Sequence, residues 1–188
     1  MNESIILIAR EYAKTVHNAA HCKYGENDQP YIVHLNAVFE WVCDHEKCFK
    51  QHKDSVYTGA AAFTHDTIED AQQTYNDVKK ATNKQVADIT LAVTDVHAEN
   101  RMLRFLNTVP KTIRDHRALV LKVCDIGANS SYGKRFKNSM YKKYQKEWAG
   151  YKRNIFVTAG RWYENELNLD EFNKLIKAVD DVLGYIPT

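Results

Sequence analysis

The chain has 188 residues, of which 44% are hydrophobic and 27% charged, which suffices for one domain with a buried core and leaves little room for a second. The 26 basic and 24 acidic residues give a net charge of +2, too small for a broad nucleic-acid-binding surface, so we expect no nucleic-acid partner. With only 7 Gly and 3 Pro, the composition favours long helices within a single domain, residues 1–188.

A membrane partner is not expected either, because no stretch approaches the roughly 20 apolar residues of a membrane span. The apolar run Ile5–Ala9 follows Glu3 and is ended at once by Arg10 and Glu11, so it predicts the first turns of a core helix. The 4 cysteines lack zinc-like spacing and indicate reduced thiols, as in a cytoplasmic protein.

The first half of the chain predicts helices with apolar residues three and four positions apart. In chain order these helices cover residues 3–20, 30–43 and 54–66, with a turn-rich loop at 23–29 and a polar connection at 44–53. Asp54 or Ser55 is the expected cap of the third helix, whose many small residues suit close packing at the centre of the fold.

The second half continues the helical pattern. It predicts helices over residues 74–80, 83–93, 99–106 and 112–123, a new element from Pro110, and C-terminal helices within about 137–184, including 148–162 and 169–183. No window alternates with period two for long enough to predict a sheet. The fold class is therefore all-α.

The densest group of chemical side chains lies in residues 60–70, AAAFTHDTIED. His65 and Asp66 are adjacent at the end of an apolar helix, where both can reach one metal ion from its edge. Glu69 and Asp70 follow one turn later, beside such an ion. A mixed set of imidazole and carboxylate groups suits a divalent transition metal better than calcium.

Two further positions fit as distant ligands of the same ion. His34 interrupts an otherwise apolar helix, and Asp125 ends the apolar run that begins at Ala118. A carboxylate at the end of a buried helix costs several kcal/mol unless it is paired or bound to a metal. Together with His65 and Asp66, these residues predict a four-ligand metal site.

The pattern H…HD…D resembles that of the HD-domain phosphohydrolases. The sequence segments around it resemble one subgroup, the RelA/SpoT-type (p)ppGpp hydrolases and their small stand-alone metazoan, bacterial and phage homologues. Residues 30–34 resemble the PYIxH segment, 65–70 the HDTxED segment and 121–129 the VKLADxxxN segment. Residues 100–104 and 110–111 resemble an NRxxR…PK stretch of the small bacterial and phage members. The resemblance implies an all-α HD-domain helical bundle, with a metal-site core at about 13–129.

This resemblance implies roles for the clustered residues. His34, His65, Asp66 and Asp125 would hold one Mn²⁺, or another divalent transition metal, and Glu69 with Asp70 would orient and deprotonate the attacking water. A divalent ion lowers the pKa of its water and polarises a phosphoryl oxygen, which agrees with this assignment.

An anionic nucleotide substrate requires cationic and polar contacts. The candidate substrate-binding residues are Lys23, Arg101, Arg104, Lys122, Asn129 and Tyr132. Lys23 falls where the family carries an Arg-Lys pair after a histidine of the first helix, here His17, but Cys22 stands in the place of the arginine. Since that arginine helps to hold the base in the family, guanine specificity stays open.

The resemblance implies a cytoplasmic enzyme, bacterial or from a phage, that removes the 3′-pyrophosphate from the alarmones ppGpp and pppGpp of the stringent response. One alternative keeps the metal site but changes the substrate to another nucleotide phosphate, such as the 2′-phosphate of NADPH, a ppApp-like alarmone or a signalling nucleotide. A second alternative is a module that binds a nucleotide without turnover. The oligomeric state stays open.

Overall fold

A computed structural model describes residues 3–186 and confirms the all-α class. The α-helices in chain order are α1 (Glu3–Ala19), α2 (Ile32–Asp44), α3 (His52–Thr64), α4 (Thr67–Asp70), α5 (Tyr75–Ala81), α6 (Lys84–Val93), α7 (Arg101–Thr112), α8 (His116–Phe136), α9 (Ser139–Glu147), α10 (Arg153–Gly160) and α11 (Leu169–Leu183). They are joined by the 3-10 turns η1 (Glu46–Cys48) and η3 (Arg161–Tyr163) and by a π-helical turn, η2 (Trp148–Lys152).

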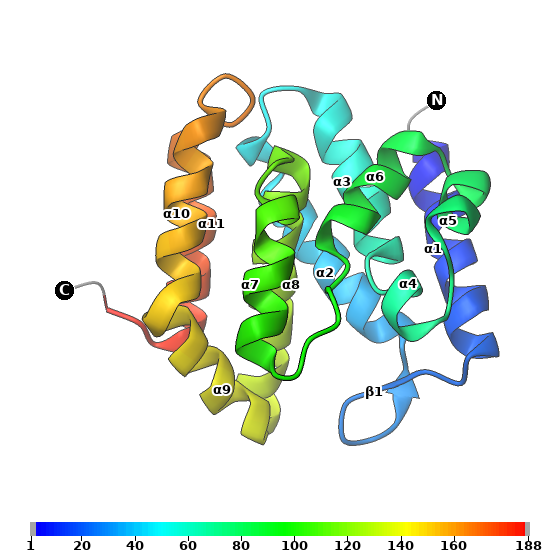
Figure 1. The fold of residues 1–188 in the computed structure, drawn as a ribbon, viewed down its shortest axis with the longest axis horizontal. Helices are drawn as coiled ribbons and strands as arrows, with labels where there is room; N and C mark the ends of the chain where they lie inside the picture. The colour runs from blue at the N-terminus through cyan, green and yellow to red at the C-terminus, as the bar shows by residue number, and fades with distance from the viewer. Residues whose placement is uncertain (1–2, 187–188) are drawn as a thin grey trace.

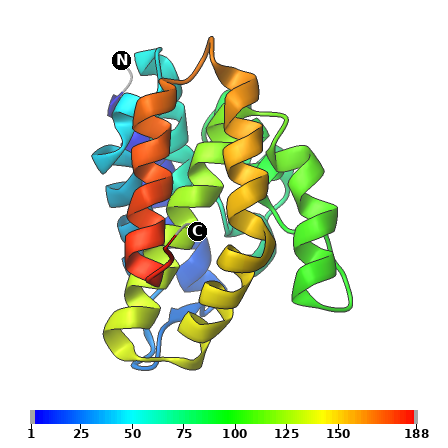
Figure 2. The same cartoon turned by 90° about the vertical axis from the view of Figure 1, so that its left-hand side faces the viewer.

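Helix α8 runs through the middle of the bundle. It packs against α2 and α3 on one side and α11 on the other, as the side view of Figure 2 shows from the α10 and α11 edge. Its residues from Ala118 to Ala128 are buried almost without interruption, which is the pattern of a helix enclosed on all sides. Nearly all of the buried apolar side chains among residues 3–186 form one cluster, from Ala9 in α1 to Leu183 in α11.

Two helix starts follow the sequence and one does not. Thr74 accepts a hydrogen bond from the Asp77 backbone in a capping box, and Asn83 accepts one from the Val86 backbone. The expected cap at Asp54 or Ser55 is wrong, because α3 begins at His52. Asp54 is instead buried in the first turn, where the His116 ring lies 3.1 Å from its carboxylate.

The expected break at Pro110 is also wrong, because α7 continues through this residue to Thr112. Proline removes one backbone donor from a helix interior, but here it stands in the last turn. That turn is held to α6 by the side chains of Lys111 and Thr112, which donate to the carbonyls of Leu91 and Ala92. Tertiary contacts therefore override the local signal.

Helix α8 extends well beyond the predicted end at Val123, so Asp125 lies within a helix and not at its end. The continuation is favoured by packing, since Gly127 faces the ring of Trp41 on α2. A Cβ atom at Gly127 would approach that ring to 2.5 Å. Only glycine allows α8 and α2 to approach so closely at this point.

The loop predicted at 23–29 contains a small hairpin. Strands β1 (Lys23–Tyr24) and β2 (Gln29–Pro30) pair antiparallel, with Lys23 opposite Pro30. Its turn uses positive φ at Gly25 and Asp28. Two residues per strand are too few to show an alternating pattern. Figure 1 places this hairpin at one end of the bundle, near α9.

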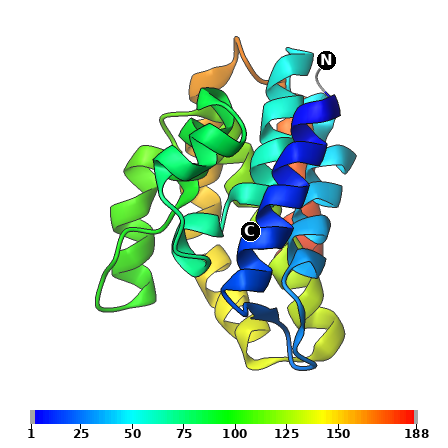
Figure 3. The ribbon, with the colours of Figure 1, turned by 90° about the vertical axis from the view of Figure 1, so that its right-hand side faces the viewer.

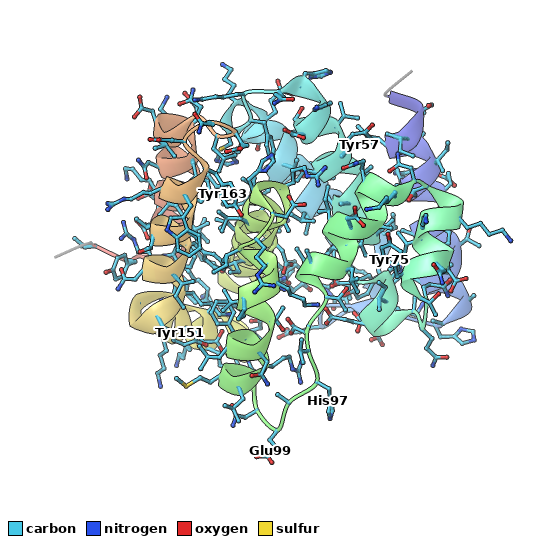
Figure 4. All side chains as sticks on the ribbon, turned by 45° about the horizontal axis from the view of Figure 1, so that its top comes forward. Tyr57, Tyr75, His97, Glu99, Tyr151 and Tyr163 are labelled. Carbon is cyan, nitrogen blue, oxygen red and sulfur yellow. The ribbon has the colours of Figure 1, made fainter. Side chains whose placement is uncertain are left out.

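Helix α7 stands out from the body of the fold, as Figure 3 shows from the α1 side. The segment that leads into it has His97 and Glu99 at its tip, pointing away from the bundle (Figure 4). Among residues 3–186, no helix is both long and apolar enough to cross a membrane.

Candidate metal centre and active-site cavity

The predicted metal ligands come from three parts of the bundle. His34 lies in α2, Asp125 in α8, and the adjacent His65 and Asp66 between α3 and α4. His65 keeps helical dihedrals (φ −57°, ψ −35°), whereas Asp66 has φ −100° and ψ 0°, in the bridge region that active-site residues often occupy. This change of direction between two helices lets neighbouring side chains point to one place, although on a continuous helix they would diverge by about 100°.

The four side chains converge closely. The two Nε2 atoms of His34 and His65 are 3.3 Å apart, and Asp66 Oδ2 lies 3.4 and 3.0 Å from them. Asp125 Oδ1 lies 3.5 and 3.7 Å from the same two nitrogens. Ligands about 2.1 Å from one ion, at angles between 90° and 109°, are about 3.0–3.5 Å apart. The donor atoms of His34, His65 and Asp66 therefore have the spacing of a common divalent metal site, and Asp125 lies beside the two imidazoles, slightly further away.

Hydrogen bonds hold two of these ligands in the required form. His65 donates from Nδ1 to the Ala62 carbonyl at 2.9 Å, which directs Nε2 towards the donor atoms of Asp66 and His34. Asn129 donates to Asp125 Oδ1 at 2.6 Å from one turn further along α8. Although burial opposes ionisation of Asp66, the imidazoles of His65 and His34 hold the pKa of this carboxyl well below its usual range. A buried, ionised carboxylate next to two imidazoles is a donor set for a divalent metal.

A tyrosine connects the ligand cluster to Asp70. The hydroxyl of Tyr31 lies 2.7 Å from Oδ2 of Asp66 and 2.7 Å from Oδ2 of Asp70. Its ring stacks on that of His17, with centroids 4.5 Å apart. Burial, followed by the charge of Asp66, raises the pKa of Asp70. Tyr31 therefore fixes the position of Asp70 relative to a metal ligand.

Glu69 lies on the other side of the cluster. One of its carboxylate oxygens accepts the backbone N–H of Asp95, which follows α6. Burial and the nearby Asp66 raise the pKa of Glu69 to about 7. Lys122 balances the local negative charge, with Nζ 3.8 Å from Asp95 and 3.5 Å from Asp125. A carboxylate with a pKa near neutrality can accept a proton from water in a hydrolysis.

One cavity of about 280 Å³ is lined by His34, Asp66 and Asp125 together with Glu69 and Asp70, while His65 is buried behind them. The metal-binding and acidic residues occupy one part of its wall, and basic and aromatic side chains from α7, α9 and η2 occupy another. Its lining includes Tyr24, Tyr31, His34, Asp66, Glu69, Asp70, Asp95, Arg101, Arg104, Phe105, Lys122, Asp125, Asn129, Tyr144 and Lys152. A site with both signs of charge suits a metal ion together with an anionic ligand.

Comparison with known proteins bears on this arrangement. No family model matches the chain. In sequence the chain is 30% identical over 168 residues to a guanosine-3′,5′-bis(diphosphate) 3′-pyrophosphohydrolase of Aquifex aeolicus, covering 85% of this chain and 22% of that protein. The chain thus spans about a fifth of the length of this curated relative.

In structure the chain is similar to a metazoan ortholog of SpoT that is described as hydrolysing ppGpp. The TM-score is 0.68 at 19% sequence identity, over 97% of each chain. The fold is an HD-domain bundle. The sequence comparison confirms the resemblance to the RelA/SpoT-type hydrolases that the motifs predicted, and the structural comparison confirms the fold.

Within this HD-domain fold, the structure brings most of the predicted substrate-binding residues to the cavity. Arg101, Arg104, Lys122 and Asn129 line it. Tyr132 lines an adjoining cavity and contacts the ring of Tyr24, with centroids 4.6 Å apart.

Lys23 is the predicted contact that the fold places elsewhere. The side chain of Lys23 is exposed and does not line the cavity. The neighbouring Tyr24 enters instead, and its hydroxyl donates to Asn129 at 3.3 Å. Cys22 lies 3.2 Å from the carbonyl of Asp70, close to the site but as a neutral thiol. The hairpin therefore presents a tyrosine where the sequence predicted a lysine contact.

Several cavity residues were not found by reasoning from the sequence. Tyr31 lies within the PYIxH segment, so the motif itself could have indicated that its side chain lies at the site. Asp95, Tyr144 and Lys152 had none, because they stand far from the motifs in sequence and reach the HD-domain site only through the packing of α6, α9 and η2.

Proposed function

We propose that this chain is a metal-dependent phosphohydrolase that removes the 3′-pyrophosphate from guanosine tetra- and pentaphosphate. The observation that carries the proposal is that donor atoms of His34, His65 and Asp66 lie together, with Asp125 beside both imidazoles, at a cavity that also contains basic side chains. The sequence similarity to a 3′-pyrophosphohydrolase supports the choice of substrate. The whole of residues 1–188 is proposed as one HD hydrolase domain.

His34, His65, Asp66 and Asp125 are the proposed ligands of a divalent transition metal, to which a mixed imidazole and carboxylate set is suited. Mn²⁺ is the proposed ion because the resemblance to the (p)ppGpp hydrolases implies it, and another divalent transition metal is the alternative. When bound, the ion would polarise a phosphoryl oxygen and make a nearby water more acidic. Asn129 holds Asp125 by its 2.6 Å hydrogen bond, and Tyr31 holds Asp66 at 2.7 Å. These contacts orient the ligands before the ion arrives.

Glu69 and Asp70 are the proposed acid–base residues. Glu69 takes a proton from water as the water oxygen attacks the phosphorus next to the 3′-oxygen, and Asp70 orients that water. The bond between this phosphorus and the 3′-oxygen breaks, and the 3′-oxygen takes up a proton, from protonated Glu69 or from water, to become the 3′-hydroxyl, which gives pyrophosphate and GDP from ppGpp. Lys122, Arg101 and Arg104 neutralise the phosphate charge, and Asn129 and Tyr132 contact the nucleoside.

One observation keeps a second substrate class open. Cys22 brings no positive charge to the hairpin, and Lys23 lies outside the cavity, so neither supplies the base contact that the family motif implies. The same metal site could then act on another nucleotide phosphate, such as the 2′-phosphate of NADPH, a ppApp-like alarmone or a signalling nucleotide.

The test is incubation of metal-stripped protein with ppGpp, with and without added Mn²⁺, and separation of the products by ion-exchange chromatography. Metal-dependent release of equal amounts of GDP and pyrophosphate is the expected result. Intact ppGpp, with cleavage of NADPH or ppApp under the same conditions, would move the proposal to the second substrate class. Tight ppGpp binding without any product would indicate a nucleotide-binding module.

A further inference from the structure

A cluster of two cations and one carboxylate stands where α7, α9 and η2 meet; Lys152 and Glu147 are largely buried, and Arg101 is 40% exposed. Arg101 donates to both oxygens of Glu147, at 2.8 and 3.0 Å, and Lys152 Nζ donates to the same carboxylate at 2.8 Å. Among residues 3–186, the contacts of Lys152 Nζ are with the carboxylate of Glu147 and with the rings of Phe105 and Tyr144. Two positive charges share one negative charge, which leaves the cluster with a net charge of +1.

The position of Lys152 is unusual for a lysine. Its side chain is only 8% exposed, yet it lines the cavity that contains the metal-ligand cluster. Lysine is almost never fully buried unless it is paired, and a charge left in an apolar site carries a large desolvation cost. Glu147 satisfies only part of this requirement, because it also binds Arg101.

The π-helical turn explains how a lysine comes to point there. In η2 the backbone makes hydrogen bonds five residues apart, so residues separated by five share a face. Trp148 and Arg153 both donate to Asp180 of α11, whereas Glu147 binds Arg101 of α7 and Lys152 lines the cavity. Such turns are often found at functional sites.

Aromatic rings complete the cluster. Lys152 Nζ lies 4.9 Å from the ring centroid of Phe105, and the guanidinium of Arg101 lies 5.4 Å from that of Tyr144. These rings hold the cations by cation–π contacts and restrict access of water, which strengthens their attraction for an anion in the cavity.

We propose that Lys152 and Arg101 form an anion subsite that binds the phosphate group of the nucleotide lying away from the metal centre. This inference rests on the proposed function, in which the 3′-pyrophosphate is placed at the metal ligands. The second phosphate group of such a substrate, the 5′-diphosphate, then meets the net positive cluster. Lys152 is a specificity-determining residue for that group.

The substrate test compares ppGpp with guanosine 3′-diphosphate, which has a 5′-hydroxyl, in the wild type and in Lys152→Met. Methionine keeps the length and apolar contacts of the side chain but removes its charge. For ppGpp, kcat/KM falls at least about tenfold, mainly through KM, because a charge-assisted hydrogen bond is lost. For the 5′-hydroxyl compound it stays within about twofold, because the lost partner is absent.

Two further variants separate binding from folding. Lys146→Met removes an exposed charge from the same segment and leaves both substrates unaffected. Lys152→Arg retains the preference for ppGpp in part, whereas a purely structural lysine would give equal losses for both substrates. Equal losses, or no loss, in Lys152→Met would overturn the proposal.

A binding measurement distinguishes failure of this subsite from failure of the proposed function. Calorimetry with inorganic pyrophosphate and metal-free protein requires no catalysis. Pyrophosphate binds the wild type and binds Lys152→Met at least about tenfold more weakly, even if the wild type does not cleave ppGpp. Equal binding by both proteins, or no binding by the wild type, would contradict the subsite.

Discussion

The adjacent residues His65 and Asp66 can reach one site because of the backbone conformation of Asp66. Asp66 is the position where α3 gives way to α4, and its bridge-region dihedrals turn two neighbouring side chains towards His34. Its carboxylate also accepts the hydroxyl of Tyr31, which in turn reaches Asp70. The hydroxyl of Tyr31 thus contacts both the predicted metal ligand Asp66 and the proposed catalytic residue Asp70.

Substitutions can distinguish the proposed metal-binding role of Asp66 from the proposed general-base role of Glu69. Asp66→Ala is expected to abolish both metal binding and turnover, because it removes a ligand and its charge together. Glu69→Ala is expected to keep the metal but to lose about 10²- to 10⁴-fold in kcat, because only the general base is gone. Metal content by atomic absorption and steady-state kinetics measure the two effects.

A matched control for these variants is Glu99→Ala, since Glu99 is exposed at the tip of the loop before α7 (Figure 4). It should leave both metal content and kcat unchanged. Substantial turnover by Asp66→Ala would refute the ligand assignment.

The clustering of the predicted metal ligands could be foreseen from the sequence because these residues lie in short motifs. His65, Asp66, Glu69 and Asp70 form one segment, and His34 and Asp125 interrupt apolar runs. Lys152 could not be found in this way, because a lysine among other lysines gives no sign that its turn is π-helical and buried. The role of Lys23 was predicted from its place in a motif, but the hairpin turns this side chain outwards.

The contact of α2 with α8 determines the geometry of the site at the level of elements, since these two helices carry His34 and Asp125. They approach each other where Gly127 faces Trp41. The continuation of α8 past Asp125, and of α7 past Pro110, could not be predicted from local signals, because both depend on contacts with helices distant in sequence.

The same contact gives a stability prediction. Gly127→Ala should destabilise the protein by about 1–3 kcal/mol, because its Cβ would lie 2.5 Å from the Trp41 ring in a packed core. Elsewhere in a helix this substitution stabilises by up to about 1 kcal/mol. Denaturant unfolding measures the change.

Gly150→Ala serves as the control for this measurement. Within residues 3–186 no atom outside its local backbone lies within 4 Å of an added Cβ at this position, so no loss of stability is expected. Similar losses in the two variants would show that the close approach of α2 and α8 is not the cause.

At the scale of the whole molecule, the cavity joins the motif-bearing helices α2, α4 and α8 to α7, α9 and η2. The first group supplies the acidic wall with the predicted metal ligands, and the second supplies a wall of basic and aromatic side chains. The composition, with a net charge of only +2, gave no sign of such local separation of charge.

Metal binding should therefore stabilise the entire fold and not only the site. Mn²⁺ at about 100 times its Kd adds roughly 2.7 kcal/mol to the free energy of unfolding, which raises Tm by about 5–10 °C. Thermal denaturation with increasing Mn²⁺ measures this shift. In Asp66→Ala the shift should vanish, and an equal shift in that variant would place the ion elsewhere.

The contacts of Asp180 have a practical consequence for choosing domain boundaries. This residue of α11 accepts hydrogen bonds from both Trp148 and Arg153, on either side of the turn that carries Lys152. A clone that stops before residue 180 would still encode every predicted metal ligand and would still match every motif. It would nevertheless leave the indole and the guanidinium without their acceptor, so an inactive fragment of this kind would say nothing about the metal centre.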